Sequence, residues 1–273
     1  MLLYEAPGSP YAQKVKIALR EKAIVFECQL PDSLGTGRTD GPFGIDNPRA
    51  EVPLLVDGEV RIFDSTIILE YLEERWSNPP LLPRDPVARA YARMTEEVCD
   101  THYEAVTWGF SEVTVFGRAT GALAEKLRSA ARQQTSVLQN WLAGRLGNTP
   151  WFGGTTFGWA DIAVAPLLHR SVMNGMAPSP GSVLANWYNR LRERPSVATT
   201  FAEYAAAAAG MPATVDAFRS GKKVREYRDH RLEWMIKSGG IDVIVAGMRD
   251  NSIRFSWPAD ASAVGRTGDL ADS

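Results

Sequence analysis

The sequence predicts two parts of different architecture: an α+β domain with the element order βαβ–ββα, and an all-helical domain after it. Short apolar runs, one amphipathic helical segment and a hairpin signal follow one another within the first 77 residues. After a proline-rich connector, the apolar residues recur at helical spacing without strand-like alternation.

The first three elements form the predicted βαβ unit. Residues 2–4 are a short apolar run that a Pro-Gly pair soon ends, as in a buried strand. Residues 10–22 place their apolar side chains at helical spacing between lysines and a glutamine, which predicts an amphipathic helix. Residues 23–28 are the second strand candidate, and the polar stretch 31–47 has no periodicity. Such a long irregular segment is usually functional or partly helical.

A β-hairpin and a second helix complete the first domain. The dipeptide Asp57-Gly58 lies between two apolar runs of four residues each, which is a strong hairpin signal. Asp64-Ser65 then begins a helix that the apolar pattern continues to about Arg75.

Helix-length patterns fill the rest of the chain. We expect a connector at residues 78–86 to separate the first domain, residues 1–77, from a helical domain, residues 87–217. Residues 218–258 are then a C-terminal extension, and the small, polar residues 259–273 are predicted to be disordered. Helices are expected at residues 87–116, 121–146, 160–173 and 183–194, and the five alanines 205–209 favour one more.

Composition argues against several classes of function. The net charge is −2, from 30 basic and 32 acidic residues, so no basic field suggests a nucleic acid or an anionic membrane as partner. The two cysteines, Cys28 and Cys99, have no metal-ligand spacing and suit a reducing compartment. The first residues lack the pattern of a signal peptide, and no apolar run approaches the ~18 residues of a membrane span. We expect a cytoplasmic protein without a metal, nucleic-acid or membrane partner.

Three signals in the first 65 residues point to a binding site. Ser9 precedes a proline that suits the first position of a helix, so Ser9 is placed as the N-cap. Val52-Pro53 enters a strand directly after a loop. Such a proline either lies on an edge strand or forms a cis turn that exposes the backbone of the preceding residue. Asp64-Ser65 begins the next helix, where free N–H groups and the helix dipole favour a carboxylate ligand. Taken singly, each signal fits an ordinary cap or turn.

In this order and spacing, the signals resemble the cytosolic glutathione S-transferases. Members carry a catalytic serine, cysteine or tyrosine near the first helix, then a loop that ends in Val-Pro, then an acidic residue followed by serine. The resemblance implies a thioredoxin-like N-terminal domain, a helical C-terminal domain and a homodimer. It covers about residues 1–210, and the matching segments are GSPYAQKVKIAL, NPRAEVPLLVDGE, FDSTIILEYLEERW, LLPRDPVARA and FGWADIAVAPLL.

The resemblance implies a glutathione-binding role for each signal. The cysteinyl backbone of glutathione would pair with the backbone of Val52, with Pro53 in the cis form. Asp64 would receive the ammonium group and Ser65 the carboxylate of the γ-glutamyl end. The Ser9 hydroxyl would face the sulfur.

Three further assignments stay open. Either Arg38 or Arg49 would meet the glycyl carboxylate. The family motif does not align the residues of this loop, so it does not decide between them. Tyr11 either supports the sulfur or packs under the first helix. Tyr4 resembles the position of the catalytic tyrosine in other classes, but with Ser9 present we expect it to pack.

Ser9 separates this chain from the omega class and from related bacterial glutathione lyases with a long C-terminal tail. They begin this helix with Cys-Pro, and a cysteine there can form a mixed disulfide with glutathione. Serine has no sulfur, so the resemblance to theta- and zeta-class members implies that it activates the glutathione thiol instead. A thiol with a pKa of ~8.5 is only slightly ionised at neutral pH. A hydrogen bond of ~1.5–3 kcal/mol from the hydroxyl to the thiolate, aided by the helix dipole, would make thiolate the major form.

Two positions depart from the family pattern. Ala50 stands where the family usually has glycine, so we expect a less tight loop there. Gly158 replaces the usual serine or threonine cap, with Asp161 three residues on, which weakens the cap by roughly a few tenths of a kcal/mol.

We expect the electrophile pocket between the two domains, lined from the first long helix of the helical domain and from the extension. Aromatic residues at helical spacing are more often core than pocket, however. The extension carries seven basic residues against three acidic ones between 218 and 237, so it is either a solvated helix face or a lid. His102, His169 and His230 have no partner at metal-ligand spacing. The aromatic candidates are Tyr103, Trp108, Phe110, Phe116, Tyr227 and Trp234.

The sequence is therefore interpreted as a serine-type glutathione transferase, with glutathione as co-substrate and a small hydrophobic electrophile, as in detoxification. The thiolate would attack an electrophilic carbon, in transfer, ether cleavage or dehalogenation. One alternative is a glutathione-dependent lyase or isomerase of small aromatic or halogenated compounds. The other is a non-catalytic binding or regulatory module of the same fold.

Overall fold

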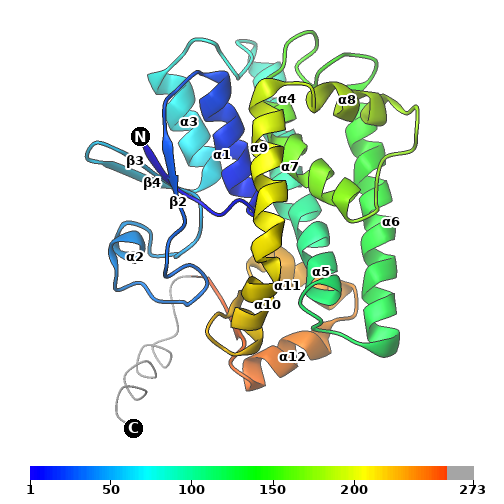
Figure 1. The fold of residues 1–273 in the computed structure, drawn as a ribbon. Coiled ribbons are helices and arrows are strands. Elements are labelled where there is room, and N and C mark those ends of the chain that lie inside the picture. Colours follow the sequence, from blue (N-terminus) through cyan, green and yellow to red (C-terminus); the bar gives the residue numbers. More distant parts are fainter. Residues whose placement is uncertain (257–273) are drawn as a thin grey trace.

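The computed structural model describes residues 1–256. Figure 1 shows the sheet with its helices on one side of the molecule, the long helices on the other, and the last helices below both. The tail predicted at residues 259–273 lies outside the described residues. Across residues 1–256, no helix combines the length and the apolar character needed to cross a membrane.

A four-stranded sheet with the order β2–β1–β3–β4 forms the centre of the N-terminal domain. β1 (Leu2–Tyr4) pairs in parallel with β2 (Glu27–Gln29) and antiparallel with β3 (Leu54–Asp57). β3 and β4 (Val60–Phe63) form the predicted hairpin. The second strand begins later than predicted because the chain first turns at Ala23, whose φ is 53°. The βαβ–ββα order is confirmed.

The first helix is enclosed on all sides, although its sequence is that of an amphipathic helix. α1 (Pro10–Glu21) packs against α3 (Ser65–Arg75) and also against α7 and α9 of the helical domain, whose bounds are given below. The polar face therefore becomes interior: Lys14 is 1% exposed and Lys16 is 2% exposed. A short helix, α2 (Pro42–Asp46), interrupts the irregular segment before β3.

The helical domain begins with a long helix that is divided into three parts. The expected helix at residues 87–116 is divided by a π-helical turn, η1 (Cys99–Tyr103). Such turns occur frequently at functional sites. The parts and the elements that follow are α4 (Pro86–Val98), η1, α5 (Glu104–Thr114), α6 (Gly121–Leu146), α7 (Trp159–Met173), α8 (Val183–Leu191), α9 (Pro195–Ala207), η2 (Ala208–Gly210) and α10 (Met211–Arg219).

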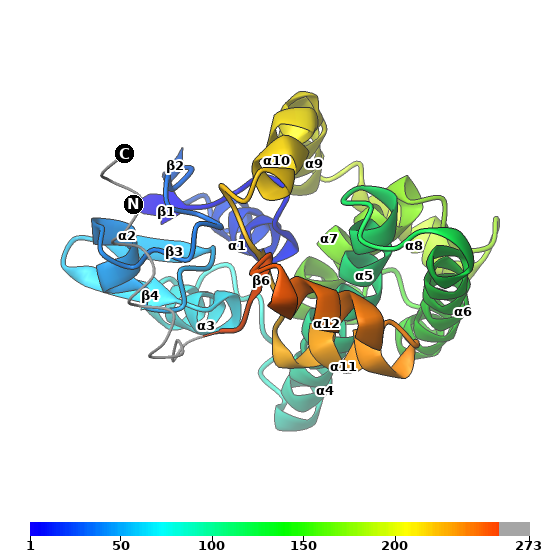
Figure 2. The same ribbon diagram turned by 90° about the horizontal axis from the view of Figure 1, so that it is seen from below.

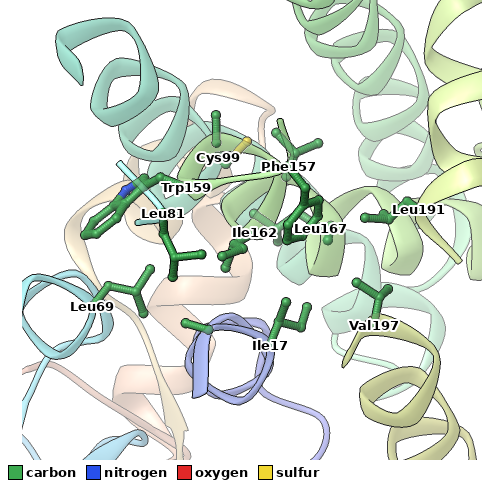
Figure 3. Packing of buried hydrophobic residues seen from close by; sticks show 14 of the residues in the cluster. Ile17, Leu69, Leu81, Cys99, Phe157, Trp159, Ile162, Leu167, Leu191 and Val197 are labelled. Atoms are coloured by element: carbon green, nitrogen blue, oxygen red, sulfur yellow. The ribbon is translucent and has the colours of Figure 1, made fainter. Parts of the chain in front are cut away.

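One hydrophobic cluster spans both domains. Ile17 from α1 and Leu69 from α3 belong to the same buried cluster as Ile162 and Leu167 from α7. Figure 3 shows these side chains converging from the two domains around Leu81 of the connector. Burying a side chain of this kind contributes roughly 1.5–3 kcal/mol, so the two domains stabilise each other.

The start of α7 explains the unusual glycine at its cap. A Cβ added at Gly158 would lie 2.6 Å from the carbonyl oxygen of Leu81, so the connector excludes serine or threonine there. Half of a capping box remains, because the Asp161 carboxylate accepts hydrogen bonds from the backbone N–H of Gly158 at 3.0 Å and from the indole of Trp187 at 2.7 Å. Burial raises the pKa of Asp161 to about 6.

The C-terminal extension joins the two domains. It consists of β5 (Arg225–Glu226), α11 (Asp229–Lys237), α12 (Ile241–Arg249) and β6 (Ile253–Arg254), with β5 and β6 paired in parallel. Figure 2 shows α11 and α12 beside the helical domain. β6 pairs with β5 and packs against α12. The Val224 N–H donates to the carbonyl of Gly35 at 2.8 Å.

Candidate functional site

A cavity of about 330 Å³ lies where the N-terminal domain, the α4–η1 segment and the extension meet. Its walls come from the loop before β3, the start of α3, the end of α4 with η1, and the start of α11. Six of the eight candidate glutathione-binding residues line it: Tyr11, Arg49, Val52, Pro53, Asp64 and Ser65.

The loop before β3 presents free backbone groups to this cavity. The Val52–Pro53 peptide bond is cis. Within residues 1–256, neither the N–H nor the C=O of Val52 is hydrogen-bonded, so both can pair with an extended peptide. Ala50 is fully buried with φ 51°, a conformation that favours glycine. The expectation of a less tight loop is therefore wrong, because Ala50 adopts the glycine-like turn.

The start of α3 forms the opposite wall. Asp64 also has a positive φ, 77°, and its carboxylate accepts a hydrogen bond from the Thr66 N–H at 3.0 Å. The Arg49 guanidinium lies 3.4 Å from the same carboxylate. Ser65 is the first residue of the helix and is 5% exposed. The helix N-terminus and a partly exposed carboxylate are thus side by side, which suits a ligand group that carries both charges.

Tyr11 connects α1 to the helical domain and to the extension. Its hydroxyl donates to the backbone carbonyl of Asp100 at 2.6 Å and lies 3.4 Å from Nε2 of His230. Burial, together with the carboxylate of Glu104, raises the pKa of Tyr11, so it stays a neutral hydroxyl.

Ser9 is the N-cap of α1, and its Oγ accepts a hydrogen bond from the Ala12 N–H at 3.3 Å. It is partly exposed and does not belong to the residues that line the cavity; Tyr11, two positions on, does. A serine hydroxyl has one donor and two acceptor sites, so capping leaves its proton free for a second partner.

A buried charge cluster forms the floor of the cavity. Lys14 Nζ lies 2.5 Å from a carboxylate oxygen of Glu96 and 2.5 Å from one of Asp100. Burial alone would lower the pKa of Lys14, but these two carboxylates raise it. Burial also raises the pKa of Asp100, to about 6, against the opposing effect of Lys14. The side chain of Thr66 also donates to Glu96, at 2.9 Å.

The extension supplies cavity residues that the sequence analysis did not assign to the glutathione site. Arg228, Asp229 and His230 line the cavity. His230 Nε2 lies 3.1 Å from the carboxylate of Glu104, which is 1% exposed. The basic composition of this segment was the available signal, although it also fits a solvated helix face.

Arg38 is not part of the cavity. Its side chain is 63% exposed and pairs with Asp40 at 2.9 Å, because both lie on the surface before α2. Arg49, the second candidate, lines the cavity and pairs with Glu51 at 3.2 Å. Tyr4 packs against Phe43, as expected.

The aromatic candidates for the electrophile pocket do not line this cavity. Tyr103 is fully buried in the core that spans both domains, and its hydroxyl accepts from the Gln139 amide at 3.1 Å. Phe116 is partly buried and packs edge-on against Phe218. Trp234 lines a second cavity, of about 200 Å³, next to His230. The other three aromatic candidates, like Trp234, belong to a separate core around α5 and α11, with exposures of 5% for Trp108, 6% for Phe110 and 1% for Tyr227.

The three histidines are not brought together. His102 is exposed, whereas His169 is buried and stacks on Phe201 with ring centres 3.8 Å apart. Across residues 1–256, no group of three or more His, Cys, Asp or Glu side chains is placed to hold a metal ion.

A mixed sheet of this order followed by a helical domain defines a thioredoxin-like domain joined to an α-helical one. Residues 3–80 match the family model of the glutathione S-transferase N-terminal domain, and residues 136–190 match that of the C-terminal domain. Glutathione S-transferase U28 of Arabidopsis thaliana is 30% identical over 204 residues, which are 72% of this chain and 86% of that protein. The chain therefore belongs to the glutathione S-transferase family, and the predicted fold and enzyme class are confirmed.

Two solved structures resemble the whole two-domain unit. A glutathione S-transferase from Methylobacterium radiotolerans, in complex with glutathione sulfonate, is 29% identical with a TM-score of 0.62, over 73% of this chain and 93% of that one. A maleylacetoacetate isomerase from Methylobacterium extorquens AM1, with bound malonate and glutathione, is 27% identical with a TM-score of 0.59, over 73% of this chain and 95% of that one.

Proposed function

We propose that this protein binds glutathione in the cavity between its domains and activates the thiol with Ser9 for attack on an electrophilic carbon. The observation that carries the proposal is that the backbone of Val52, unpaired within residues 1–256, lines the same cavity as the N-terminus of α3. A short peptide with an amino-acid group at one end matches this arrangement. The membership of the chain in a glutathione-using family supports glutathione as that peptide.

Each part of glutathione has a partner in this proposal. The cysteinyl backbone pairs with Val52, and the γ-glutamyl end lies at Asp64 and Ser65. Arg49 and Arg228 are the cations on the cavity wall nearest the loop before β3, and they would meet the glycyl carboxylate. Each already pairs with Glu51, Arg49 at 3.2 Å and Arg228 at 3.5 Å, so a bound carboxylate would share them with it.

The Ser9 hydroxyl would act as a hydrogen-bond donor and not as a nucleophile or base. It would donate its proton to the thiolate while its oxygen keeps accepting from the Ala12 N–H. The thiol proton would leave to solvent, the sulfur would form a bond to the electrophilic carbon, and the leaving group would depart with the bonding pair. A hydrogen bond to the anion and the positive end of α1 both favour the thiolate over the thiol.

A titration of glutathione thiolate absorbance in wild type and Ser9→Ala tests the proposal. We expect a thiolate band in the wild type, its loss in Ser9→Ala, and glutathione binding in both. The matched control is Ser182→Ala, which removes the same kind of cap at α8, where Ser182 Oγ accepts from the Ala185 N–H at 3.2 Å. A band that survives in Ser9→Ala, or is absent from the wild type, would contradict the proposal.

A glutathione-dependent isomerase or lyase is the second candidate. The similarity to the maleylacetoacetate isomerase structure favours it, since both reactions would use the same thiolate. Product analysis separates the two: a transferase consumes glutathione, and an isomerase returns it. A non-catalytic module would bind glutathione without thiolate formation or turnover. A cytoplasmic homodimer belongs to the same proposal, and light scattering measures the oligomeric state.

A further inference from the structure

Arg170 lies beside the loop that carries Ser9. It lies in the last turn of α7 and donates a hydrogen bond to the backbone carbonyl of Gly8. Within residues 1–256, its guanidinium forms no ion pair with an Asp or Glu side chain. Other enclosed cations do: Lys14 with Glu96, and Arg231 with Glu104.

The surroundings of Arg170 leave its charge uncompensated. Burial lowers the pKa of this arginine, which means that the site disfavours a cation without a partner. The carboxylate of Glu104 acts in the opposite direction, but it is bound to Arg231 at 2.7 Å and to His230 at 3.1 Å. Arg170 is partly exposed, so solvent offsets part of the cost of its unpaired charge, and an anion beside the guanidinium would offset more of it.

The hydrogen bond to Gly8 places the guanidinium close to the N-terminus of α1. Gly8 directly precedes Ser9, whose hydroxyl caps α1, and the free N–H groups of the first turn add positive potential at the same place. Tyr11, two positions after Ser9, lines the glutathione cavity. The guanidinium therefore lies beside the loop whose next residue, Ser9, caps α1.

We propose that Arg170 is a positioning residue for the glutathione thiolate: it holds the Gly8–Ser9 loop through the Gly8 carbonyl and supplies a positive charge that favours the anion. This inference rests on the proposed function. It assigns to α7 a part in thiol activation in addition to its part in the core.

The expected effect follows from the range of a single charge. An opposite charge within ~4–6 Å changes an acid dissociation constant by roughly ten- to a thousandfold. Arg170 is partly exposed, so solvent reduces its influence. We expect Arg170→Gln to lower the acid dissociation constant of the bound thiol by roughly three- to thirtyfold.

The experiment is a pH titration of thiolate absorbance with saturating glutathione, in the wild type and in three variants. Arg170→Gln keeps a donor for the Gly8 carbonyl but removes the charge, and Arg170→Lys keeps the charge. Arg190→Gln is the matched control, because Arg190 also donates to a backbone carbonyl, that of Pro150 at 2.6 Å. Neither arginine is among the residues that line the cavity, but only Arg170 contacts the loop that carries Ser9.

The inference requires that Arg170→Gln shift the titration to higher pH while Arg170→Lys and Arg190→Gln follow the wild type. A wild-type titration in Arg170→Gln overturns it. A shift to higher pH in Arg170→Lys also overturns it, because this variant keeps the positive charge. That test can be made even if Arg170→Gln does not fold. If the wild type forms no thiolate, the proposed function fails as well. If only Ser9→Ala changes the titration, the proposed function stands and this inference alone is wrong.

Discussion

Replacing Lys14 by methionine should destabilise the protein in a pH-dependent way. Lys14 is 1% exposed and holds the carboxylates of Glu96, 3% exposed, and Asp100, 18% exposed. Methionine fills a similar volume, so the main cost is the uncompensated charge of two buried carboxylates. Breaking such a pair costs about 3–5 kcal/mol. We expect a loss of about this size in the free energy of unfolding from urea denaturation at neutral pH.

The pH dependence of this loss follows from Asp100. Its pKa of about 6 in the folded protein is above the ordinary value, so the native state holds more protons than the unfolded state between those two pH values. Protonated Asp100 therefore stabilises the folded protein at low pH, and this contribution to the free energy of unfolding is lost as the pH rises through 6. Without Lys14 the pKa of Asp100 should rise further, so the gap between variant and wild type should widen above pH 6.

Lys16→Met is the matched control for Lys14→Met. Lys16 is 2% exposed and pairs with Glu5 at 3.0 Å and with Glu203 at 2.5 Å, away from the cavity. Both variants should lose stability, but only Lys14→Met should weaken glutathione binding in calorimetry. A loss of unfolding free energy below about 1 kcal/mol in Lys14→Met would refute the reasoning, because a surface ion pair contributes no more than that. A loss that does not change with pH would also refute it.

Three further variants test other parts of the structure. Ala50→Gly should raise the thermal midpoint slightly, because the left-handed conformation costs an L-residue about 1–2 kcal/mol, partly offset by glycine's backbone entropy; a lower midpoint would contradict this. Gly158→Ser should destabilise the protein by more than 1 kcal/mol in urea denaturation despite adding a cap, since its Cβ meets the Leu81 carbonyl; a gain would show that the connector gives way. Arg228→Gln should weaken glutathione binding several-fold in calorimetry, whereas the exposed Arg38→Gln should not; equal affinities for wild type and Arg228→Gln would remove the extension from the site.

The parts of the site that the sequence predicts are those set by neighbouring residues. Ser9 before a proline, Val52-Pro53 before a strand and Asp64-Ser65 at a helix start are local patterns, and each appears where it was expected. That Val52-Pro53 and Asp64-Ser65 line one cavity followed only from the family resemblance, because local patterns carry no information on distance in space.

The parts that sequence patterns missed depend on distant contacts. The helical spacing of α1 predicts one polar face, but α7 and α9 cover that face, and the carboxylates that pair with Lys14 lie more than eighty positions away. Helical spacing also gives the same pattern for core and for pocket aromatics, so Trp108 and Phe110 could not be told from lining residues. Arg228 and His230 reach the cavity only because the extension folds back onto both domains.

A crystal structure of the protein with bound glutathione would test the central claim most directly. We predict the tripeptide backbone beside Val52, its γ-glutamyl end at Ser65, and the sulfur within hydrogen-bond distance of the Ser9 hydroxyl. A sulfur that contacts the Tyr11 hydroxyl instead of Ser9, or glutathione bound outside the cavity between the domains, would contradict the account.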